Sequence, residues 1–263
     1  NNGYKIWPMV SNGVAANKSL NITSNIMNDY EKRKKLIESI VNKCVEYELD
    51  GINIDFENMK SEDKDMYSRF IIELEPRLKE IGMVLSVDVT APDGGDTWSM
   101  CFDRHVIGNV ADYTIFMAYD QNGSSSTKPG TTAGYNWVKL NLVKFLQTEE
   151  INPNKLILAV PLYTRIWTTN SDGKVISNNS LSIKNTEAEI PDGITKQWND
   201  ELKQNYVTFS SGNNTKQIWT EDIDSLKAKI SLMKENNLAG IASWDANMAY
   251  DDIWTMFKNE LNN

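Results

Sequence analysis

Short apolar segments alternate with amphipathic helical segments along most of this chain, and this alternation limits the fold more than any other feature. Six segments have the length and pattern of β-strands: residues 5–10, 51–56, 83–90, 113–118, 156–160 and 240–244. Strands that alternate with helices form right-handed β-α-β units and a parallel sheet. A chain of 263 residues is within the size range of a single α/β barrel.

The helical segments carry apolar residues at spacings of three and four. In the segment from about residue 28 to residue 48 these are Ile37, Ile40, Val41, Cys44 and Val45. Further helices are expected at residues 61–81, 137–147, 223–235 and 252–261. Pro76 lies inside the first of these, and because proline lacks a backbone N–H, we expect it to kink or split that helix.

One long stretch, residues 168–221, breaks the alternation. It is polar and contains the sequence YVTFSSGNNTKQIW, which has two β-like runs around a Gly-Asn-Asn turn. We interpret it as an insertion that carries a hairpin between the last two parallel strands. The whole chain, residues 1–263, is then a single domain. The chain starts with Asn, so we expect it to be a processed form or part of a longer sequence.

The composition argues against several classes of function. A net charge of −9 disfavours a surface that binds nucleic acid or another anionic polymer. No apolar run reaches the roughly 18 residues that would suggest a membrane span. Cys44 and Cys101 form neither a disulfide framework nor a metal-ligand spacing, and we expect Cys44 to be a buried free thiol. His105 is the only histidine, which excludes a multi-histidine zinc site. We therefore expect chemistry based on carboxylates, tyrosines and amides, without a metal or organic cofactor.

The segment DGINIDFE, residues 50–57, is the most informative in the chain. Side chains alternate between the two faces of a strand, so Asn53, Asp55 and Glu57 share one face and the apolar residues between them share the other. Two carboxylates held this close raise each other's pKa, and burial acts in the same direction. Glu57 could then remain protonated near neutral pH and donate a proton to a glycosidic oxygen. The alternative is a strand end whose acids face water.

This segment resembles the D-G-x-D-x-D-x-E signature of family 18 glycoside hydrolases, the chitinase-like TIM (β/α)8 barrels. Three further motifs extend the resemblance in the same order along the chain. MAYD at 117–120 is similar to the family's M-x-Y-D, PLYTR at 161–165 to its P-x-Y-G-R, and ASW at 242–244 to its tryptophan-bearing last strand. The segments DGINIDFEN, SVDVT, WSMCFDR and MAYDQ resemble the bacterial extracellular and spore-associated branch.

The resemblance implies a retaining mechanism in which the substrate's own 2-acetamido oxygen attacks the anomeric carbon. It assigns Glu57 as the acid/base, Asp55 as the residue that holds the acetamido group, and Tyr119 as a donor to the acetamido carbonyl. It further implies that Asp120 contacts the sugar at the cleavage position.

Three more residues match substrate-binding positions of the family. The resemblance implies that Trp244 forms a hydrophobic floor under the sugar, and that Tyr163 and Arg165 line the substrate cleft. The mechanism requires no cofactor and no metal.

The chain departs from the family pattern at several positions. The second acid of the signature is Asn53, for which we expect an altered pH dependence and not a loss of activity. Thr164 replaces the glycine of P-x-Y-G-R, and the third-strand motif S-x-G-G is present only as VSNG at residues 10–13. If residues 5–10 form the third barrel strand, the first two β/α units are absent from this chain and six of the eight strands remain.

The resemblance implies a glycosidase that cleaves β-1,4 bonds in N-acetylglucosamine-containing polymers, either peptidoglycan and spore cortex or chitin-like chains. The alternative is a catalytically silent, chitinase-like carbohydrate-binding protein. We expect a monomer located outside the cell, in the wall or on the spore, with a glycan as its partner and with neither nucleic acid nor membrane bound. Asp88 of SVDVT could contact substrate or form an ion pair with Arg104.

Overall fold

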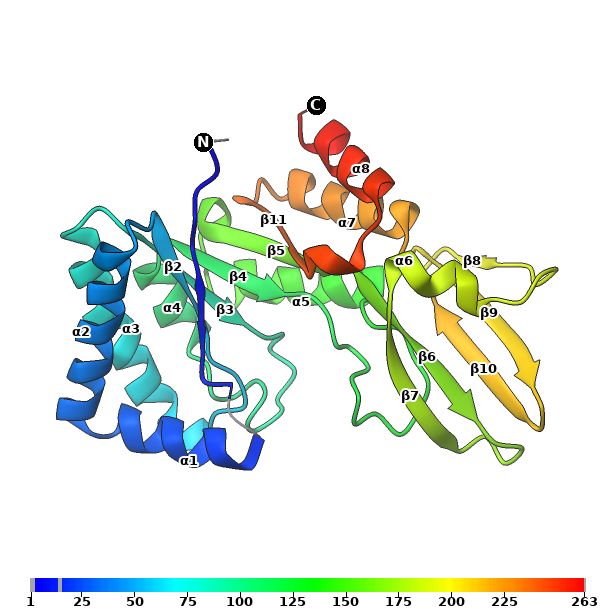
Figure 1. The fold of residues 1–263 in the computed structure, drawn as a ribbon, viewed down its shortest axis with the longest axis horizontal. Coiled ribbons are helices and arrows are strands. Elements are labelled where there is room, and N and C mark those ends of the chain that lie inside the picture. The colour runs from blue at the N-terminus through cyan, green and yellow to red at the C-terminus, as the bar shows by residue number, and fades with distance from the viewer. Residues whose placement is uncertain (1–2, 14–15, 263) are drawn as a thin grey trace. The chain divides into compact units, whose positions relative to one another are not determined.

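The computed structural model describes residues 3–13 and 16–262 (Figure 1). The chain divides into two compact units. The first comprises Asn1–Met117 and Val143–Ile157, and the second comprises Ala118–Leu142 and Leu158–Asn263. All six expected parallel strands are present: β1 (Met9–Ser11), β2 (Gly51–Asp55), β3 (Val84–Val89), β4 (Tyr113–Met117), β5 (Leu156–Pro161) and β11 (Gly240–Trp244).

The first unit is a parallel sheet with helices packed against it. Strands β1 to β4 lie in sequence order, and in the β2–β3 pairing Asn53 is opposite Ser86. The helices are α1 (Ala16–Met27), α2 (Tyr30–Glu46), α3 (Lys64–Lys79) and α4 (Arg104–Val110), with a 3-10 turn at Ser61–Asp63 before α3. Helix α3 packs against β3 and against α1, α2 and α4 (Figure 1). The parallel sheet covered by helices agrees with the prediction.

The first unit differs from the prediction in two ways. Pro76 does not split α3, because the fully buried Leu74 and Leu78 on either side of it hold the helix against the core. Helix α1 was not expected. Asp29, the residue between α1 and α2, caps α2 by accepting a hydrogen bond from the Lys32 backbone N–H at 3.1 Å. Cys44 is a buried free thiol, as predicted.

The second unit combines the rest of the parallel strands with an antiparallel sheet. Strand β5, which begins in the first unit, is the neighbour of β11 in sheet order. The helices that begin in this unit are α5 (Tyr135–Gln147), α6 (Ile183–Thr186), α7 (Ile223–Glu235) and α8 (Asp251–Leu261). Short 3-10 turns lie at Pro153–Lys155 in the first unit and at Glu187–Glu189 and Ala246–Met248 in the second. Within the described residues, no helix is both long enough and apolar enough to span a membrane.

The antiparallel sheet has five strands in the order β7-β6-β10-β9-β8 (Figure 1). They are β6 (Tyr163–Thr169), β7 (Val175–Ser182), β8 (Gln197–Asn199), β9 (Gln204–Ser211) and β10 (Asn214–Trp219). The predicted hairpin is the β9–β10 pair, with Ser211 opposite Asn214. The sheet begins at Tyr163, before the predicted start of the insertion at residue 168, because β6 already pairs with β7 and β10. One face of the sheet buries an apolar cluster of Ile166, Leu181, Val207, Phe209 and Ile218.

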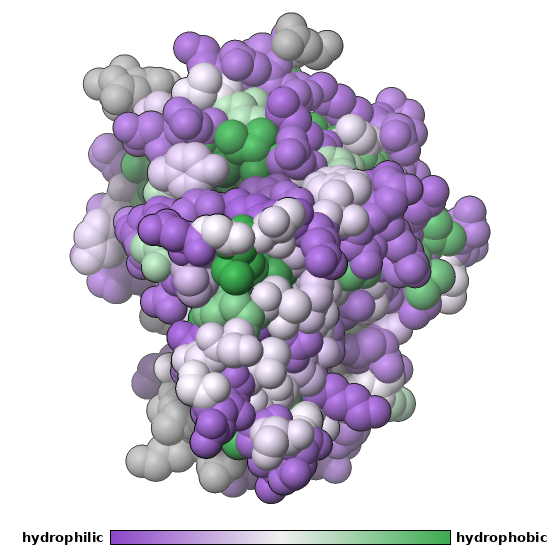
Figure 2. Space-filling model, turned by 90° about the vertical axis from the view of Figure 1, so that its right-hand side faces the viewer, coloured by the Kyte–Doolittle hydropathy of each residue, from purple (hydrophilic) through white to green (hydrophobic). Residues whose placement is uncertain are grey.

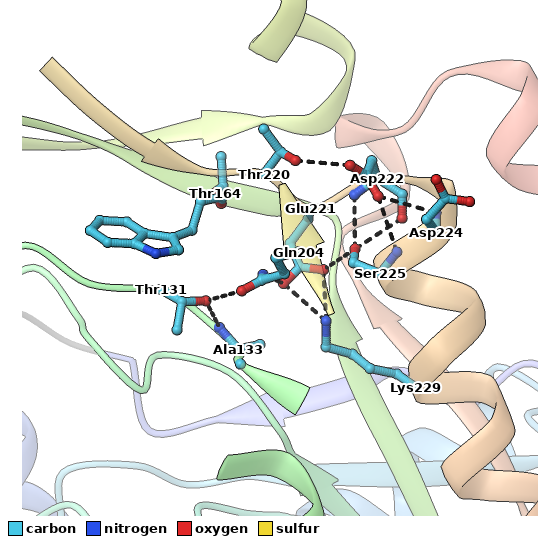
Figure 3. Close-up of polar contacts among 12 residues, drawn as sticks. Thr131, Ala133, Thr164, Gln204, Thr220, Glu221, Asp222, Asp224, Ser225 and Lys229 are labelled. Atoms are coloured by element: carbon cyan, nitrogen blue, oxygen red, sulfur yellow. Dashed lines mark hydrogen bonds and ion pairs between the residues drawn. The ribbon is translucent and has the colours of Figure 1, made fainter. Parts of the chain in front are cut away.

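A buried polar network joins this sheet to α7 (Figure 3). The Lys229 ammonium lies 3.1 and 2.9 Å from the two carboxylate oxygens of Glu221, and both side chains are fully buried. Gln204 Nε2 donates to Glu221 at 2.6 Å, and Ser225 Oγ donates to it at 2.8 Å. The carboxylate therefore has three partners, which is what a charge in a protein interior requires. Asp222 caps α7, and its carboxylate accepts from the backbone N–H of Ser225 at 3.0 Å.

Candidate active site

The carboxylate face of β2 has the alternation that the sequence predicts. Ile52 and Ile54 are buried, at 4% and 0% exposed, whereas Asn53 and Asp55 are half-buried. Strand β2 ends at Asp55, and Glu57 follows two residues later, also half-buried. Asn53 and Asp55 therefore share one face of the strand, and Glu57 lies just beyond its end, near enough to Asp88 for its charge to raise the pKa of that carboxyl.

The Asn12 side chain holds the backbone of Glu57. Its amide oxygen accepts from the Glu57 backbone N–H at 2.9 Å, and its amide nitrogen donates to the Glu57 carbonyl oxygen at 2.8 Å. The same nitrogen donates to Thr23 Oγ1 at 3.0 Å. This two-point contact fixes the backbone at Glu57 beyond the end of the strand. Asn12 belongs to the VSNG segment, and sequence reasoning did not assign this role to it.

Asn53 is part of a chain of hydrogen bonds between β2 and β3. Ser86 Oγ donates to the Asn53 amide oxygen at 2.8 Å, and the Asn53 amide nitrogen donates to Asp88 Oδ2 at 2.9 Å. The pKa of the Asp88 carboxyl is raised to about 7, mainly by burial; the Asn53 hydrogen bond opposes the rise, and the nearby Asp55 and Glu57 carboxylates add to it. An acid on β3 thus lies next to the position where this chain has Asn53 in place of the Asp of the signature.

The proposed ion pair between Asp88 and Arg104 does not form. Arg104 is buried, and its guanidinium donates to the carbonyl oxygens of Thr90 at 3.0 Å, Ala91 at 3.2 Å and Ser99 at 3.0 Å. The Arg104 guanidinium thus bonds backbone carbonyls of the segment after β3 and stabilises that segment. The Asp88 carboxylate instead accepts a hydrogen bond from Asn53.

Asp55 and Tyr67 complete this group of titratable side chains. Burial raises the pKa of the Asp55 carboxyl. Burial also raises the pKa of the Tyr67 phenol well above its ordinary value, and the charges of Asp88 and Asp55 raise it further. In the described part of the chain, Asp55 Oδ1 and the Tyr67 hydroxyl are buried without a hydrogen-bond partner. Such atoms are available to a bound polar group.

Asp88→Asn is expected to remove a pH dependence of stability. The folded-state pKa of about 7 exceeds the ordinary value of 3.8, so the folded state retains a proton that the unfolded chain has lost between these pH values. The contribution to the free energy of unfolding is complete below pH 3.8 and is lost as the pH rises towards 7. Each unit of pKa difference corresponds to about 1.4 kcal/mol. The variant should therefore be more stable than the parent above pH 7 by a few kcal/mol.

The effect is measured by urea unfolding of parent and variant at pH 5 and at pH 8. The difference in their free energies of unfolding should change between the two pH values. Asparagine resembles the protonated acid and can still accept from Asn53. Asp65→Asn, at an exposed position of α3, is the control and should show the same small difference at both pH values. If the difference in free energy of unfolding between Asp88→Asn and the parent does not change with pH, the pKa of Asp88 is not raised in the folded state.

The second unit brings Asp120, Tyr163 and Arg165 together. The Tyr163 hydroxyl donates to Asp120 Oδ1 at 2.7 Å, and Arg165 Nη2 lies 3.6 Å from the same oxygen. Tyr163 and Arg165 are buried, at 6% and 9% exposed. Burial raises the pKa of the Tyr163 phenol, and the Asp120 charge raises it further, so the hydroxyl remains a donor. Asp120 has a positive φ of 58°, a backbone conformation that Asp tolerates better than most residues.

Three other residues belong to this second group. The Tyr119 ring contacts the Tyr163 ring edge-on, with centroids 6.2 Å apart. Asn178 of β7 accepts from Arg165 Nη1 at 3.0 Å, a contact that the polar sequence of β7 did not indicate. Trp244 ends β11 with its side chain 44% exposed, and its carbonyl oxygen accepts from the Leu162 backbone N–H at 2.7 Å.

The eight residues predicted as a site thus form two groups, one in each unit. The first unit has Asn53, Asp55 and Glu57; the second has Tyr119, Asp120, Tyr163, Arg165 and Trp244. In the second group, Tyr163 contacts Tyr119 and Asp120, and Arg165 lies near the Asp120 carboxylate; in the first, Asn53 bonds Ser86 and Asp88, and the Glu57 backbone bonds Asn12. Both contain carboxylates close to aromatic side chains, and the described residues contain no cluster of His, Cys, Asp or Glu suited to a metal ion.

Comparison with known proteins gives relatives over nearly the whole length. The chain is 28% identical over 261 residues to the uncharacterized glycosylase YvbX of Bacillus subtilis, covering 95% of this chain and 73% of that protein. It is 23% identical over 247 residues to the cortical fragment-lytic enzyme of Bacillus subtilis, covering 90% of this chain and 56% of that enzyme. The chain therefore spans little more than half the length of the second relative.

A solved structure has the same fold. The chitinase from Chromobacterium violaceum superposes with a TM-score of 0.88 at 24% identity, over 98% of this chain and 80% of that one. The α/β fold, with its parallel strands and antiparallel insertion, is therefore that of a TIM-barrel chitinase. The family described as Glycosyl hydrolases family 18 matches residues 3–249. This chain belongs to glycosyl hydrolase family 18.

Proposed function

We propose that this chain cleaves β-1,4 bonds of N-acetylglucosamine-containing glycans with retention of configuration, with Glu57 as the acid/base. The observation that carries the proposal is the geometry at the end of β2. Asn12 fixes the Glu57 backbone at two points, 2.9 and 2.8 Å, two residues from Asp55, whose pKa burial raises. A glutamate held in place through its backbone, next to a half-buried second carboxyl, suits acid/base chemistry on a glycosidic bond.

In the first step the Glu57 carboxyl donates its proton to the glycosidic oxygen while the bond from that oxygen to the anomeric carbon breaks. The substrate's acetamido oxygen attacks the anomeric carbon from the opposite side and forms an oxazolinium ion. Asp55 accepts a hydrogen bond from the acetamido N–H and stabilises the positive charge of the oxazolinium ion. In the second step the Glu57 carboxylate removes a proton from water, which attacks the anomeric carbon and reopens the ring. The acid is then restored and the product has the starting configuration.

The second group supplies the sugar contacts in this proposal. Tyr119 donates to the acetamido carbonyl, and Trp244 provides an apolar surface under the sugar ring. Asp120 accepts from a sugar hydroxyl, while Tyr163 and Arg165 hold its carboxylate in place. We further propose that the six parallel strands correspond to strands three to eight of the family barrel, within a single catalytic domain.

We infer a wall glycan as the substrate class. The motif at 50–57 resembles the family signature, in which an acetamido-holding Asp precedes the acid, and one relative is named a cortical fragment-lytic enzyme. The spore cortex and the vegetative wall are the proposed sites of action, and we propose a monomer outside the cell.

The test is hydrolysis of a fluorogenic N-acetylglucosamine oligomer and of purified peptidoglycan, with the first-formed anomer identified by proton NMR. The β-anomer should form first, and the matched glucose oligomer should not be cleaved because it has no acetamido oxygen. Cleavage of the glucose oligomer at a similar rate, or first formation of the α-anomer, would contradict the mechanism. Glycan binding without any turnover would favour a carbohydrate-binding protein.

A further inference from the structure

The antiparallel sheet of the second unit carries an aromatic hollow of about 280 Å³. Its lining residues come from the three strands on one side of the sheet: Gln197, Trp198, Asn199, Tyr206 and Trp219. Three of these side chains are aromatic and two are amides, and none is charged. The mechanism proposed above uses none of them.

Three of the lining residues form one row across the strands. Gln197 of β8 pairs with Tyr206 of β9, which pairs in turn with Trp219 of β10. Residues directly opposite each other on neighbouring strands point to the same face. The Tyr206 and Trp219 rings contact each other with centroids 4.8 Å apart, and Gln217 Nε2 donates to the Tyr206 hydroxyl at 2.8 Å. The two rings are therefore held in place before any ligand binds.

The row leads directly to Arg165. Ile218 of β10 pairs with Ile166 of β6, so the next residues along these strands, Trp219 and Arg165, come opposite each other. Ile218 and Ile166 belong to the apolar cluster on one face of the sheet. Their neighbours Trp219 and Arg165 therefore lie on the opposite face, in one row with Tyr206 and Gln197. With neighbouring strands about 4.8 Å apart, the row extends roughly 14 Å from Arg165.

We propose that this hollow binds a further N-acetylhexosamine unit of the same glycan that is bound by the Asp120–Tyr163–Arg165 group, an inference that rests on the proposed function. Aromatic faces pack against the C–H face of a pyranose ring, and amides can bond its hydroxyl and acetamido groups. The uncharged lining suits a neutral sugar better than a stem peptide, whose carboxylates and amines need charged partners. In this proposal the glycan site continues from Arg165 along the face of the antiparallel sheet that carries Trp219, Tyr206 and Gln197.

The side of the molecule on which β8, β9 and β10 lie in Figure 1 also favours a sugar over a protein partner. The side of the molecule that Figure 2 shows is mostly hydrophilic, with hydrophobic residues in small separate patches among paler ones. Protein interfaces have an apolar centre of larger extent. A few rings with amides around them match the sparse contacts of a carbohydrate site.

The test measures binding of N-acetylglucosamine hexamer and dimer by calorimetry, with Glu57→Gln present in every protein to prevent turnover. Trp219→Ala should weaken hexamer binding about tenfold and reduce the hexamer-to-dimer affinity ratio towards one, because the dimer is too short to extend from Arg165 across the row. Gln197→Ala changes an exposed side chain and should give a smaller loss without affecting folding. Trp254→Ala is the matched control, since this tryptophan of α8 is 40% exposed and outside the hollow.

Each outcome separates this inference from the proposed function. If the parent hydrolyses glycans but the Trp219→Ala and Gln197→Ala proteins bind the hexamer as tightly as the Trp254→Ala control, the hollow is not a sugar site. If no glycan is hydrolysed but Trp219→Ala lowers the affinity for the hexamer more than that for the dimer, the hollow is a sugar site and the catalytic proposal is wrong. Absence of any length-dependent binding in the parent also overturns the inference.

Discussion

Glu57→Gln is expected to lower kcat for N-acetylglucosamine oligomers by about 10²–10⁴-fold, the usual contribution of a general acid/base. Glutamine preserves the size of the side chain but cannot donate a proton to the leaving oxygen. The Asn12 contacts involve only the Glu57 backbone, at 2.9 and 2.8 Å, so the substitution leaves the local structure in place. Glycan affinity should therefore change by less than about threefold, and kcat should carry the loss.

The measurement is steady-state kinetics on a fluorogenic oligomer, together with calorimetric affinity for an unlabelled one. Substrates with a good leaving group need less protonation, so the loss should be smaller for a nitrophenyl glycoside than for a natural oligomer. Glu80→Gln is the control, because its side chain is 74% exposed at the end of α3. A Glu57→Gln variant with unchanged kcat on the natural oligomer would remove Glu57 from the chemistry.

The parallel part of the fold could be predicted because local periodicity encodes it. All six strands were located, and the helix expected at residues 223–235 is α7 at Ile223–Glu235. Short strands buried by neighbouring helices are continuous apolar runs, and the helices between them repeat every three to four residues. Half of the residues of helix α1 are Asn, Ser or Thr, which are weak helix formers, so the helix was not recognised from its sequence.

The antiparallel sheet was only partly predicted. The β9–β10 hairpin has a clear turn between two β-like runs, whereas β7, VISNNSLS, is polar and mostly half-buried or exposed. Strand β6 follows β5 after a single residue, so YTRIWTT could be taken for the continuation of a barrel strand. Pairing between distant segments decides this structure, and no local pattern records it.

The candidate site shows the same division. The alternation in DGINIDFE correctly placed Asn53 and Asp55 on one face, because strand geometry fixes it; β2 ends before Glu57. The partners of these residues could not be found this way. Asn12 contacts Glu57 across 45 positions, and Asp88 contacts Asn53 across 35. Both contacts depend on the register between strands, which sequence spacing alone does not give.

Lys229→Met is expected to lower the free energy of unfolding by about 3–5 kcal/mol, the usual cost of leaving one partner of a buried ion pair alone. Lys229 and Glu221 are fully buried, and the ammonium lies 2.9 and 3.1 Å from the carboxylate oxygens (Figure 3). Methionine fills a similar volume, so the loss reports the charge and not a cavity. Urea unfolding at pH 7 measures it.

The pH dependence and a double variant show whether the unpaired carboxylate is the cause. Burial already raises the pKa of Glu221, and Lys229 opposes that rise, so without Lys229 the folded state should hold a proton on Glu221 to higher pH. The stability deficit of Lys229→Met should therefore be larger at pH 8 than at pH 5.

Adding Glu221→Gln to Lys229→Met should recover much of the lost stability, since a neutral amide can still bond Ser225 and Gln204. Lys227→Met, on the half-exposed side of the same helix, should change stability by less than about 1 kcal/mol. Equal losses at residues 227 and 229, or a double variant no better than the single one, would mean that this pair does not hold α7 to the sheet.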